Sequence, residues 1–426
     1  MKPHPELLTQ NQQFEKQIIE LAPDVYGAVG FAASNVFMLE GEDGLVIIDT
    51  TESTRAAENI LSEFRKISGK PVHTIIYTHS HRDHISGASV FAEGGHPEVI
   101  ASDNFESDLI DIDTRHPMPD KALMARTKRQ FGIGLSYPEE RVNIGCGPGD
   151  RPMEGLGAGH ISPNLSVSAD RTKLSRCGVN FELIKAPGET PDHIVVWLDS
   201  KKILCCGDNF YSSFPNLYPP RGTAYRDFNA WADTLDLLME FNAEVLACGH
   251  TMPVSGAKKI KQTLTDYRDA IKHVVAKTVE GMNQQLGPDE IASTVCLPDD
   301  LKDKPYLKEF YGKVSWSVRA YFAGTLGWFD GNPTNLEKLP PAEYANRFIK
   351  LAGGAAALLQ TAQQAVDAHD YQWALELCDQ LIAVNLQTAL AKELKVTSLR
   401  ALADLEINAP ARNYYLLSAL EIEQSS

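Results

Sequence analysis

Short apolar runs alternate with amphipathic stretches over the first 280 residues, and this pattern predicts strands and helices in turn. The runs predicted as strands are residues 25–31, 35–39, 45–48, 72–77, 181–185, 194–198, 203–206 and 244–247. Helical periodicity covers residues 53–67, a stretch that starts near residue 85, and residues 126–131, 227–241 and 254–277. Two βα-rich halves with polar residues at their strand ends predict an αββα sandwich, a fold of the α/β class.

The pattern changes after residue 280, where strand signals stop and Ala, Leu and Gln dominate. Helical periodicity then covers residues 344–359, 360–369, 372–383 and 388–405. Residues 370–375 resemble the middle of a tetratricopeptide-like hairpin, but a single hairpin is a weak repeat signal. We therefore divide the chain into a mixed part, residues 1–280, and an all-helical part, residues 281–426.

Composition and charge narrow the classes of function. The 426 residues exceed one ordinary core and suit two domains. Lys and Arg number 40 and Asp and Glu 56, so the net charge of −16 argues against a nucleic-acid surface. No apolar run approaches the roughly 20 residues that span a bilayer. The number of cysteines, seven, is odd and indicates free thiols. No secretion signal is visible, so we expect a cytoplasmic location, or a periplasmic or secreted one if the N-terminus is trimmed.

The sequence THSHRDH, residues 78–84, places three histidines and an aspartate within seven positions, directly after a predicted strand. A lone histidine at such a place would be an ordinary surface or core residue. The spacing H-x-H-x-D-H is different, because neutral imidazole and carboxylate together are ligands for zinc, manganese or iron. Since chemistry is often placed on loops at strand ends, the motif predicts a metal site containing His79, His81, Asp83 and His84.

Three later turns also place metal-ligand side chains just after predicted strands. They contain Glu189 in APGET, Asp208 in CGDN and His250 in ACGH. Each alone would be an ordinary turn residue, but separate strands can bring them together with the histidine motif. His193, four residues after Glu189, is the alternative ligand at that place. Residues 145–159 are rich in Gly and Pro with little periodicity, and we expect them to form a long loop over the site.

In this order, the motif and the three turns resemble the metal-site pattern of the metallo-β-lactamase superfamily. Most of that superfamily has P-G-H-T where this chain has P-G-E-T, and a glutamate there is similar to the zinc-dependent alkylsulfatases. The stretches DVYGAVGF, GLVIIDTTES, RTKRQFG, NLYPPRGTAYRD and YGKVSWSVRAYFAGTLGWFDGNP also resemble that family. The resemblance covers nearly the whole chain. It implies a metallo-β-lactamase sandwich in residues 1–280, followed by an all-helical dimerisation domain in residues 281–426.

The family resemblance implies two divalent metal ions, with zinc expected, and assigns a set of ligands to them. His79, His81 and Glu189 would bind the first ion, Asp83, His84 and His250 the second, and Asp208 both. Two ions together lower the pKa of a shared water from about 16 towards 7, which gives hydroxide at neutral pH. The better-known bacterial alkylsulfatases carry glutamate where Asp208 stands, so we expect a shorter bridge or closer ions here. Asp83, Asp208 and Arg221 are also predicted to be catalytic.

The resemblance also implies a pocket for sulfate. Asn216 and Arg221 match the sulfate-holding Asn and Arg of the family motif N-L-Y-x-x-R-G. A guanidinium meets two oxyanion oxygens at once and an amide donates to another, so both residue types suit the task. The alternative is that Arg221 is a structural ion-pair partner. Trp316 stands where familiar members have a histidine that helps to hold sulfate, which implies a less polar or differently shaped pocket.

Residues 314–329 contain an unusual number of large apolar side chains, namely Val314, Trp316, Tyr321, Phe322, Leu326, Trp328 and Phe329. Part of this set is expected to be core. Because the resembled domain joins two subunits, and two-fold pairs are the commonest assembly, we expect a homodimer. We also expect Trp316 to line the mouth of the active site.

The sequence thus predicts a binuclear metal-dependent enzyme that hydrolyses alkyl or aryl sulfate monoesters, with a small-molecule substrate. One alternative is a hydrolase of the same fold that acts on a lactone, thioester, phosphoester or β-lactam. Another is a metal-binding scaffold that has lost its chemistry and whose helical half recruits partners. The complete set of seven predicted ligands argues against that loss.

Overall fold

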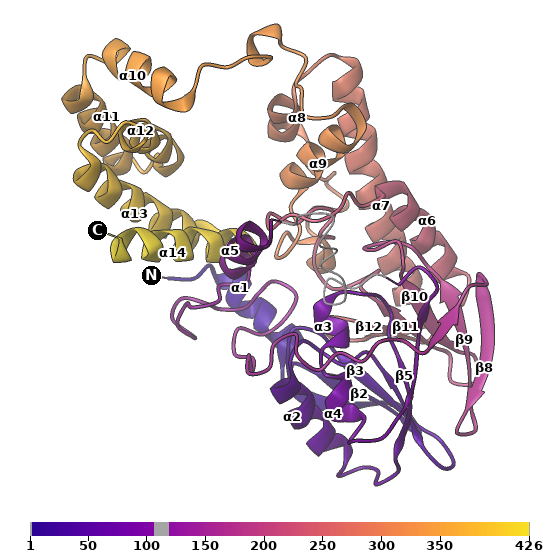
Figure 1. Cartoon of the computed structure of the whole chain (residues 1–426). Helices are drawn as coiled ribbons and strands as arrows, with labels where there is room; N and C mark the ends of the chain where they lie inside the picture. Colours follow the sequence, from indigo (N-terminus) through magenta and orange to yellow (C-terminus); the bar gives the residue numbers. More distant parts are fainter. Residues whose placement is uncertain (1, 106–118, 426) are drawn as a thin grey trace.

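Two β-sheets packed face to face form the centre of the molecule in the computed structural model, which describes residues 2–105 and 119–425 (Figure 1). The first sheet has the strand order β1 to β7, with bounds Gln17–Ala22, Val25–Val29, Val36–Glu40, Leu45–Ile48, Val72–Ile76, Glu98–Ser102 and Leu165–Val167. The second has the order β13-β12-β11-β10-β9-β8. Its strands, from β8 to β13, are Arg171–Arg176, Val179–Lys185, Ile194–Leu198, Ile203–Gly207, Val245–Cys248 and Val254–Ser255.

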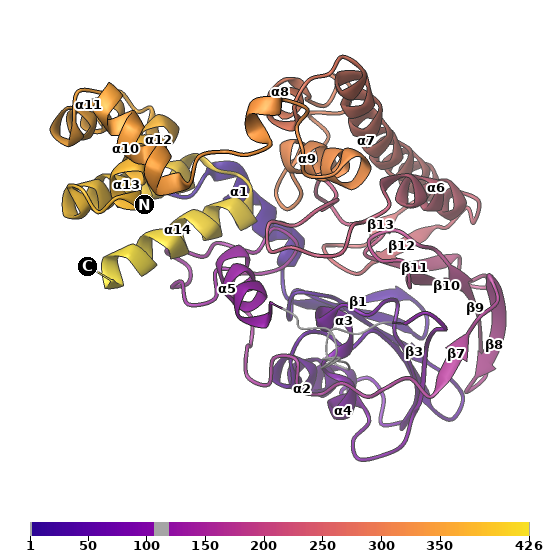
Figure 2. The ribbon, with the colours of Figure 1, turned by 45° about the horizontal axis from the view of Figure 1, so that its top comes forward.

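Strand periodicity explains the layers. On β4, Val46 and Ile48 face a core shared by both sheets, whereas Leu45 and Ile47 face the helices on the other side. The helices over the first sheet are α2 (Thr54–Phe64), α3 (Arg82–Ile85) and α4 (Ala88–Phe91). Those over the second sheet are α6 (Phe228–Met239) and α7 (Ala257–Asn283). Figure 2 shows these layers from another direction, and they confirm the predicted αββα sandwich.

The helical part forms two groups. α8 (Pro288–Thr294) and α9 (Val314–Leu326) share an apolar core with α6 and α7. α10 (Pro341–Leu351), α11 (Ala355–Asp367), α12 (Tyr371–Ala383) and α13 (Thr388–Leu405) contain a separate core. Figure 1 shows an extended segment between the two groups. The boundary at residues 280 and 281 therefore stays a prediction, because the core of the sandwich continues into α9.

The last helix, α14 (Ala409–Gln424), returns to the first part of the chain and packs against α5 (Asp120–Gln130). Arg129 on α5 pairs with Glu421 on α14, at 2.6 Å between Nη2 and the carboxylate. The short α1 (Pro5–Gln10) lies close to this contact in both views, beside the loops that follow α5 (Figures 1 and 2). The helical part thus contacts the first part of the chain through α9 and through α14, among other places.

Some predicted element bounds were wrong for local reasons. The helix predicted at residues 254–277 begins only at Ala257, because Val254 and Ser255 form β13 and Gly256 turns the chain with φ 97°. The helix expected from about residue 85 is instead split into the short α3 and α4. The expected strand Val72–Ile76 and helix Thr388–Leu405 are present. No helix among the described residues is long and apolar enough to cross a membrane.

Candidate metal centre

The predicted ligands come from loops at one edge of the two sheets. β4 and β5 run parallel, as do β11 and β12, so the carboxyl ends of each pair point the same way. The residues after β5 carry the histidine motif, those after β11 carry Asp208, and those after β12 carry His250. Strand pairing therefore brings together side chains that lie far apart in the sequence.

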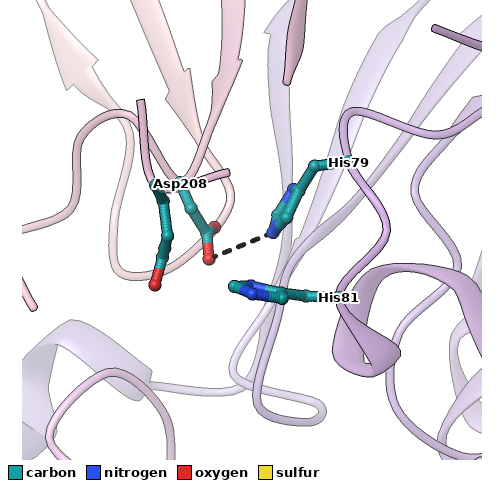
Figure 3. Close-up of side chains that lie close together, drawn as sticks. His79, His81 and Asp208 are labelled. Carbon is teal, nitrogen blue, oxygen red and sulfur yellow. Dashed lines mark ion pairs between the residues drawn. The ribbon is translucent and has the colours of Figure 1, made fainter. Parts of the chain in front are cut away.

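One group of ligand-type atoms consists of His79, His81, Glu189 and Asp208, and these atoms all lie within 4.8 Å of one another. Figure 3 shows the side chains of His79, His81 and Asp208 turned toward one another from the two sheets. The Nε2 atom of His79 lies 3.7 Å from Oδ2 of Asp208. This is the set predicted for the first ion.

A second group consists of Asp83, His84, Asp208 and His250, again with ligand-type atoms within 4.8 Å. Nε2 of His84 lies 3.2 Å from Oδ1 of Asp208, and Nε2 of His250 lies 3.1 Å from Oδ2. Asp208 is a member of both groups. Within the second group, its Oδ1 lies near His84 and its Oδ2 lies near His250. The structure brings all seven predicted ligands together, while their roles as ligands stay predictions.

The atoms at the centre of these groups fit a cation. Nε2 of His79 and of His84, Oε2 of Glu189 and Oδ1 of Asp208 are buried without any hydrogen bond. Buried polar atoms left unpaired are costly, about 1–3 kcal/mol each. Imidazole nitrogen with carboxylate oxygen is a donor set that divalent zinc accepts. The residues present therefore fit two divalent ions. His81 and Asp83 are only half-buried, so they mark the side on which the site opens.

Buried partners orient the histidines of the second group. Asp49 accepts hydrogen bonds from the Thr78 amide at 2.8 Å and the Thr78 hydroxyl at 2.9 Å, and contacts Nδ1 of His84 at 2.8 Å. The carbonyl oxygen of Ala33 lies 2.6 Å from Nδ1 of His250. A carbonyl only accepts, so Nδ1 of His250 carries the proton and Nε2 is left for a metal ion. Sequence analysis did not find Asp49 or Ala33 as supports.

The electrostatics of the two groups differ. Burial lowers the pKa of His79 and of His81 well below the usual range. Burial also opposes the charged form of His84, but Asp208, Asp49 and Asp83 outweigh it and raise the pKa of His84 well above its usual value. The second group thus differs from the first in having three carboxylates, Asp49, Asp83 and Asp208, close to one histidine.

His193, the alternative to Glu189, lies outside both groups. Its Nε2 accepts a hydrogen bond from the Asp208 amide at 3.1 Å, and its ring stacks on His79 with 4.8 Å between centroids. Burial lowers the pKa of His193 to about 3, so the ring is neutral at ordinary pH. The geometry therefore favours Glu189 as the ligand and gives His193 the task of positioning Asp208.

Arg226 is a charged residue of the site that the sequence analysis missed, although it lies in the quoted stretch NLYPPRGTAYRD. Its Nη1 lies 2.6 Å from Oε1 of Glu189, and both side chains are more than nine-tenths buried. The same Nη1 donates to the carbonyl of Asn216. Burial raises the pKa of Glu189 to about 8 even though Arg226 opposes the rise. Arg226 thus occupies one oxygen of Glu189 and leaves Oε2 without a hydrogen bond.

The predicted sulfate-holding residues lie at different depths. Asn216 is buried, its main-chain N–H donates to the Tyr211 hydroxyl at 2.7 Å, and its side-chain Oδ1 has no hydrogen bond. Arg221 is half-buried, and its main-chain N–H donates to the side-chain oxygen of Gln130 at 3.0 Å. Trp316 is half-buried on α9 with the Lys313 ammonium 5.8 Å from its ring centroid. Asn216 is joined to the first group through Arg226, which contacts Glu189, while places for Arg221 and Trp316 at the site stay predictions.

Known families match both parts of the chain. The metallo-β-lactamase superfamily model matches residues 29–250, and the alkyl sulfatase dimerisation model matches residues 287–425. The chain is 37% identical over 394 residues to a linear primary-alkylsulfatase from Pseudomonas sp. (strain ATCC 19151), covering 91% of this chain and 73% of that one. This chain belongs to the alkylsulfatase family of the metallo-β-lactamase superfamily.

Other relatives agree with this membership. An (R)-specific secondary-alkylsulfatase from Pseudomonas sp. is 30% identical, and the match covers 95% of this chain but 62% of that one. The solved structure of the stereoselective inverting sec-alkylsulfatase Pisa1, also from Pseudomonas sp., superposes with a TM-score of 0.90 at 28% identity. That match covers all of this chain and 69% of Pisa1. The protein is therefore a hydrolase with a divalent-metal site, and sulfate ester hydrolysis is the activity that its family indicates.

Proposed function

We propose that this protein hydrolyses sulfate monoesters of alkyl alcohols, or of aryl alcohols, with two zinc ions at the centre described above. The observation that carries the proposal is the pair of four-residue ligand groups that share Asp208. His79, His81 and Glu189 would hold the first ion and Asp83, His84 and His250 the second. When bound, the two ions supply an acidic water and positive charge next to the ester.

The protein's own residues then bind and orient the ester. Arg221 and the Asn216 amide would hold sulfate oxygens, because guanidinium and amide N–H groups both donate to an oxyanion. Arg226 holds Glu189 in place through the 2.6 Å contact and opposes the rise in the pKa of Glu189 that burial causes. Hydrolysis consumes one water and releases the alcohol, sulfate and a proton. If the C–O bond breaks, sulfate leaves as a weakly basic anion and the site needs no strong general acid; if the S–O bond breaks, the departing alcohol oxygen takes a proton.

We further propose that the protein works as a homodimer. The match of residues 287–425 to a dimerisation domain supports this assembly. Large apolar side chains are also exposed on the helical part, with Leu351 at 88% and Trp328 at 76% of their maximum. Such side chains on a monomer would favour aggregation, whereas a two-fold contact would cover them.

A turnover panel tests the proposed reaction. Zinc-loaded protein is offered primary and secondary alkyl sulfates, aryl sulfates, lactones, thioesters, phosphoesters and a β-lactam, and product release is measured. We expect the highest kcat/KM for an alkyl or aryl sulfate. The variant His81→Ala should lose this turnover, and the exposed His73→Ala on β5 serves as its control. A clear preference for any of the other ester classes would overturn the proposal.

A further inference from the structure

Three consecutive residues in the loop between β2 and β3 contact the second ligand group. The Ala33 carbonyl accepts from Nδ1 of His250 at 2.6 Å, and the Ser34 hydroxyl donates to the main-chain carbonyl of Asp83. The Asn35 side-chain amide donates to the carbonyls of Cys248 at 2.9 Å and Thr251 at 2.8 Å, on either side of His250. This short loop therefore determines where two of the predicted ligands of the second ion lie.

The amide side of Ala33 is fixed by a buried ion pair. The Ala33 N–H donates to Oε1 of Glu52 at 2.9 Å. Nε of Arg151 lies 2.9 Å from the same oxygen, and the two charged side chains are only 2% and 7% exposed. Arg151 comes from the long loop that the sequence analysis predicted over the site. A charged pair buried this deeply is no more stabilising than apolar residues of similar volume, which suggests a task other than stability.

The same long loop meets Ala33 a second time, on its carbonyl side. A Cβ atom added to Gly147 would lie 2.8 Å from the Ala33 oxygen and 2.9 Å from its Cα. The need for glycine here is steric, because the backbone of Gly147 is not in the left-handed region. Arg151, through Glu52, therefore confines the backbone N–H of Ala33, and Gly147 confines its carbonyl.

We propose that Glu52, Gly147 and Arg151 are positioning residues for the second metal ion, and that they act through the backbone of Ala33. By fixing the Ala33 carbonyl they set the ring orientation and the protonated nitrogen of His250. Residues that orient a metal ligand without touching the metal typically change metal affinity by about 10–100-fold when they are removed. The inference rests on the proposed two-ion centre, but it concerns ion binding rather than turnover.

A matched pair of double variants tests this proposal. Glu52→Gln with Arg151→Met removes both buried charges together and so avoids leaving one of them unpaired. The control is Arg55→Gln with Glu154→Gln, which removes an exposed pair that joins the same two segments at 3.0 Å. The affinity of metal-free protein for each of two zinc equivalents is measured by competition with a chromophoric chelator, without substrate. We expect the second ion to bind about 10–100-fold more weakly, the first ion unchanged, and the control like the wild type.

Gly147→Ala provides an independent variant that changes no charge. It should weaken the second ion alone by displacing the Ala33 carbonyl, while Gly69→Ala, which has open space around the added atom, should not. If the variants bind both ions like the wild type, or lose both ions equally, the positioning role is wrong. A wild-type protein that binds two ions but cleaves no sulfate ester would contradict only the proposed function.

Discussion

The two ligand groups share Asp208 but are attached to different parts of the molecule. The second group is tied to the first sheet, because Asp49 contacts His84 and Ala33 contacts His250. In the first group, Glu189 is held by Arg226, whose guanidinium also binds the Asn216 carbonyl. One group is therefore supported from the first sheet and the loops around Ala33, and the other is joined to a residue predicted to hold sulfate.

This difference predicts different consequences of substitution. A change around the second group should alter retention of an ion and leave substrate affinity nearly unaltered. A change around the first group should alter both ion retention and substrate affinity. Arg226 contacts the predicted metal ligand Glu189 and also Asn216, which is predicted to hold sulfate. Asp208, the residue common to both groups, should be the most sensitive position.

The largest expected effect is that of Asp208→Asn. Removing the shared carboxylate should weaken the binding of both ions by more than the roughly 10–100-fold that is typical when a residue supporting a metal ligand is lost. Turnover should vanish. Zinc content and sulfate release are measured together, with the exposed Asp199→Asn as control. Full retention of both ions would show that Asp208 does not bridge them.

Arg226→Gln should produce the next largest effect. Breaking a buried ion pair from one side costs about 3–5 kcal/mol, because Glu189 is left without its partner. Metal-free protein should melt at a lower temperature, and added zinc should recover more stability than in the wild type. Thermal unfolding with and without zinc checks this, and KM for an alkyl sulfate should rise as well. An unchanged melting temperature would mean that Glu189 and Arg226 do not depend on each other.

Glu189→Gln and His193→Gln sharpen the assignment of the first group. The first variant removes a ligand charge and should lower affinity for the first ion by at least about tenfold. The second removes the acceptor of the Asp208 amide and the ring stacked on His79 but no predicted ligand atom, and it should be milder. Chelator competition gives both affinities. The reverse ranking would make His193 the ligand and Glu189 its support.

Trp316→His should have the smallest effect. If tryptophan has replaced a sulfate-holding histidine, the substitution should lower KM for sulfate esters by a few-fold, with zinc content and melting temperature unchanged. The control is Trp373→His, at a position where the side chain is 41% exposed. Unchanged kinetic constants would mean that Trp316 serves packing alone.

Much of the metal centre was predictable because its ligands follow a simple local rule. Apolar runs identified β5, β11 and β12, and each ligand lies within eight residues of a strand end. The strands β1 and β8 were missed because their exposed and half-exposed positions lack the strong apolar pattern of buried strands. Helix α14 was missed as well, and it carries the buried polar residues Arg412 and Asn413.

The supports of the ligands were not predictable from local pattern. Ala33 contacts His250 across 217 positions of sequence, and nothing about an alanine in a turn indicates that its carbonyl orients a histidine. Arg226 appears in the sequence as one more charged residue before a helix, and only the fold buries it against Glu189. Contacts of this kind depend on how distant loops meet, which periodicity does not encode.

Stepwise reconstitution tests the central claim, a binuclear centre for sulfate ester hydrolysis, most directly. Metal-free protein is titrated with zinc while sulfate release from an alkyl sulfate is followed at each equivalent per chain. The shared position of Asp208 predicts that full turnover appears only as the second equivalent binds, and that a chelator abolishes it. Full turnover at one equivalent per chain would contradict the account.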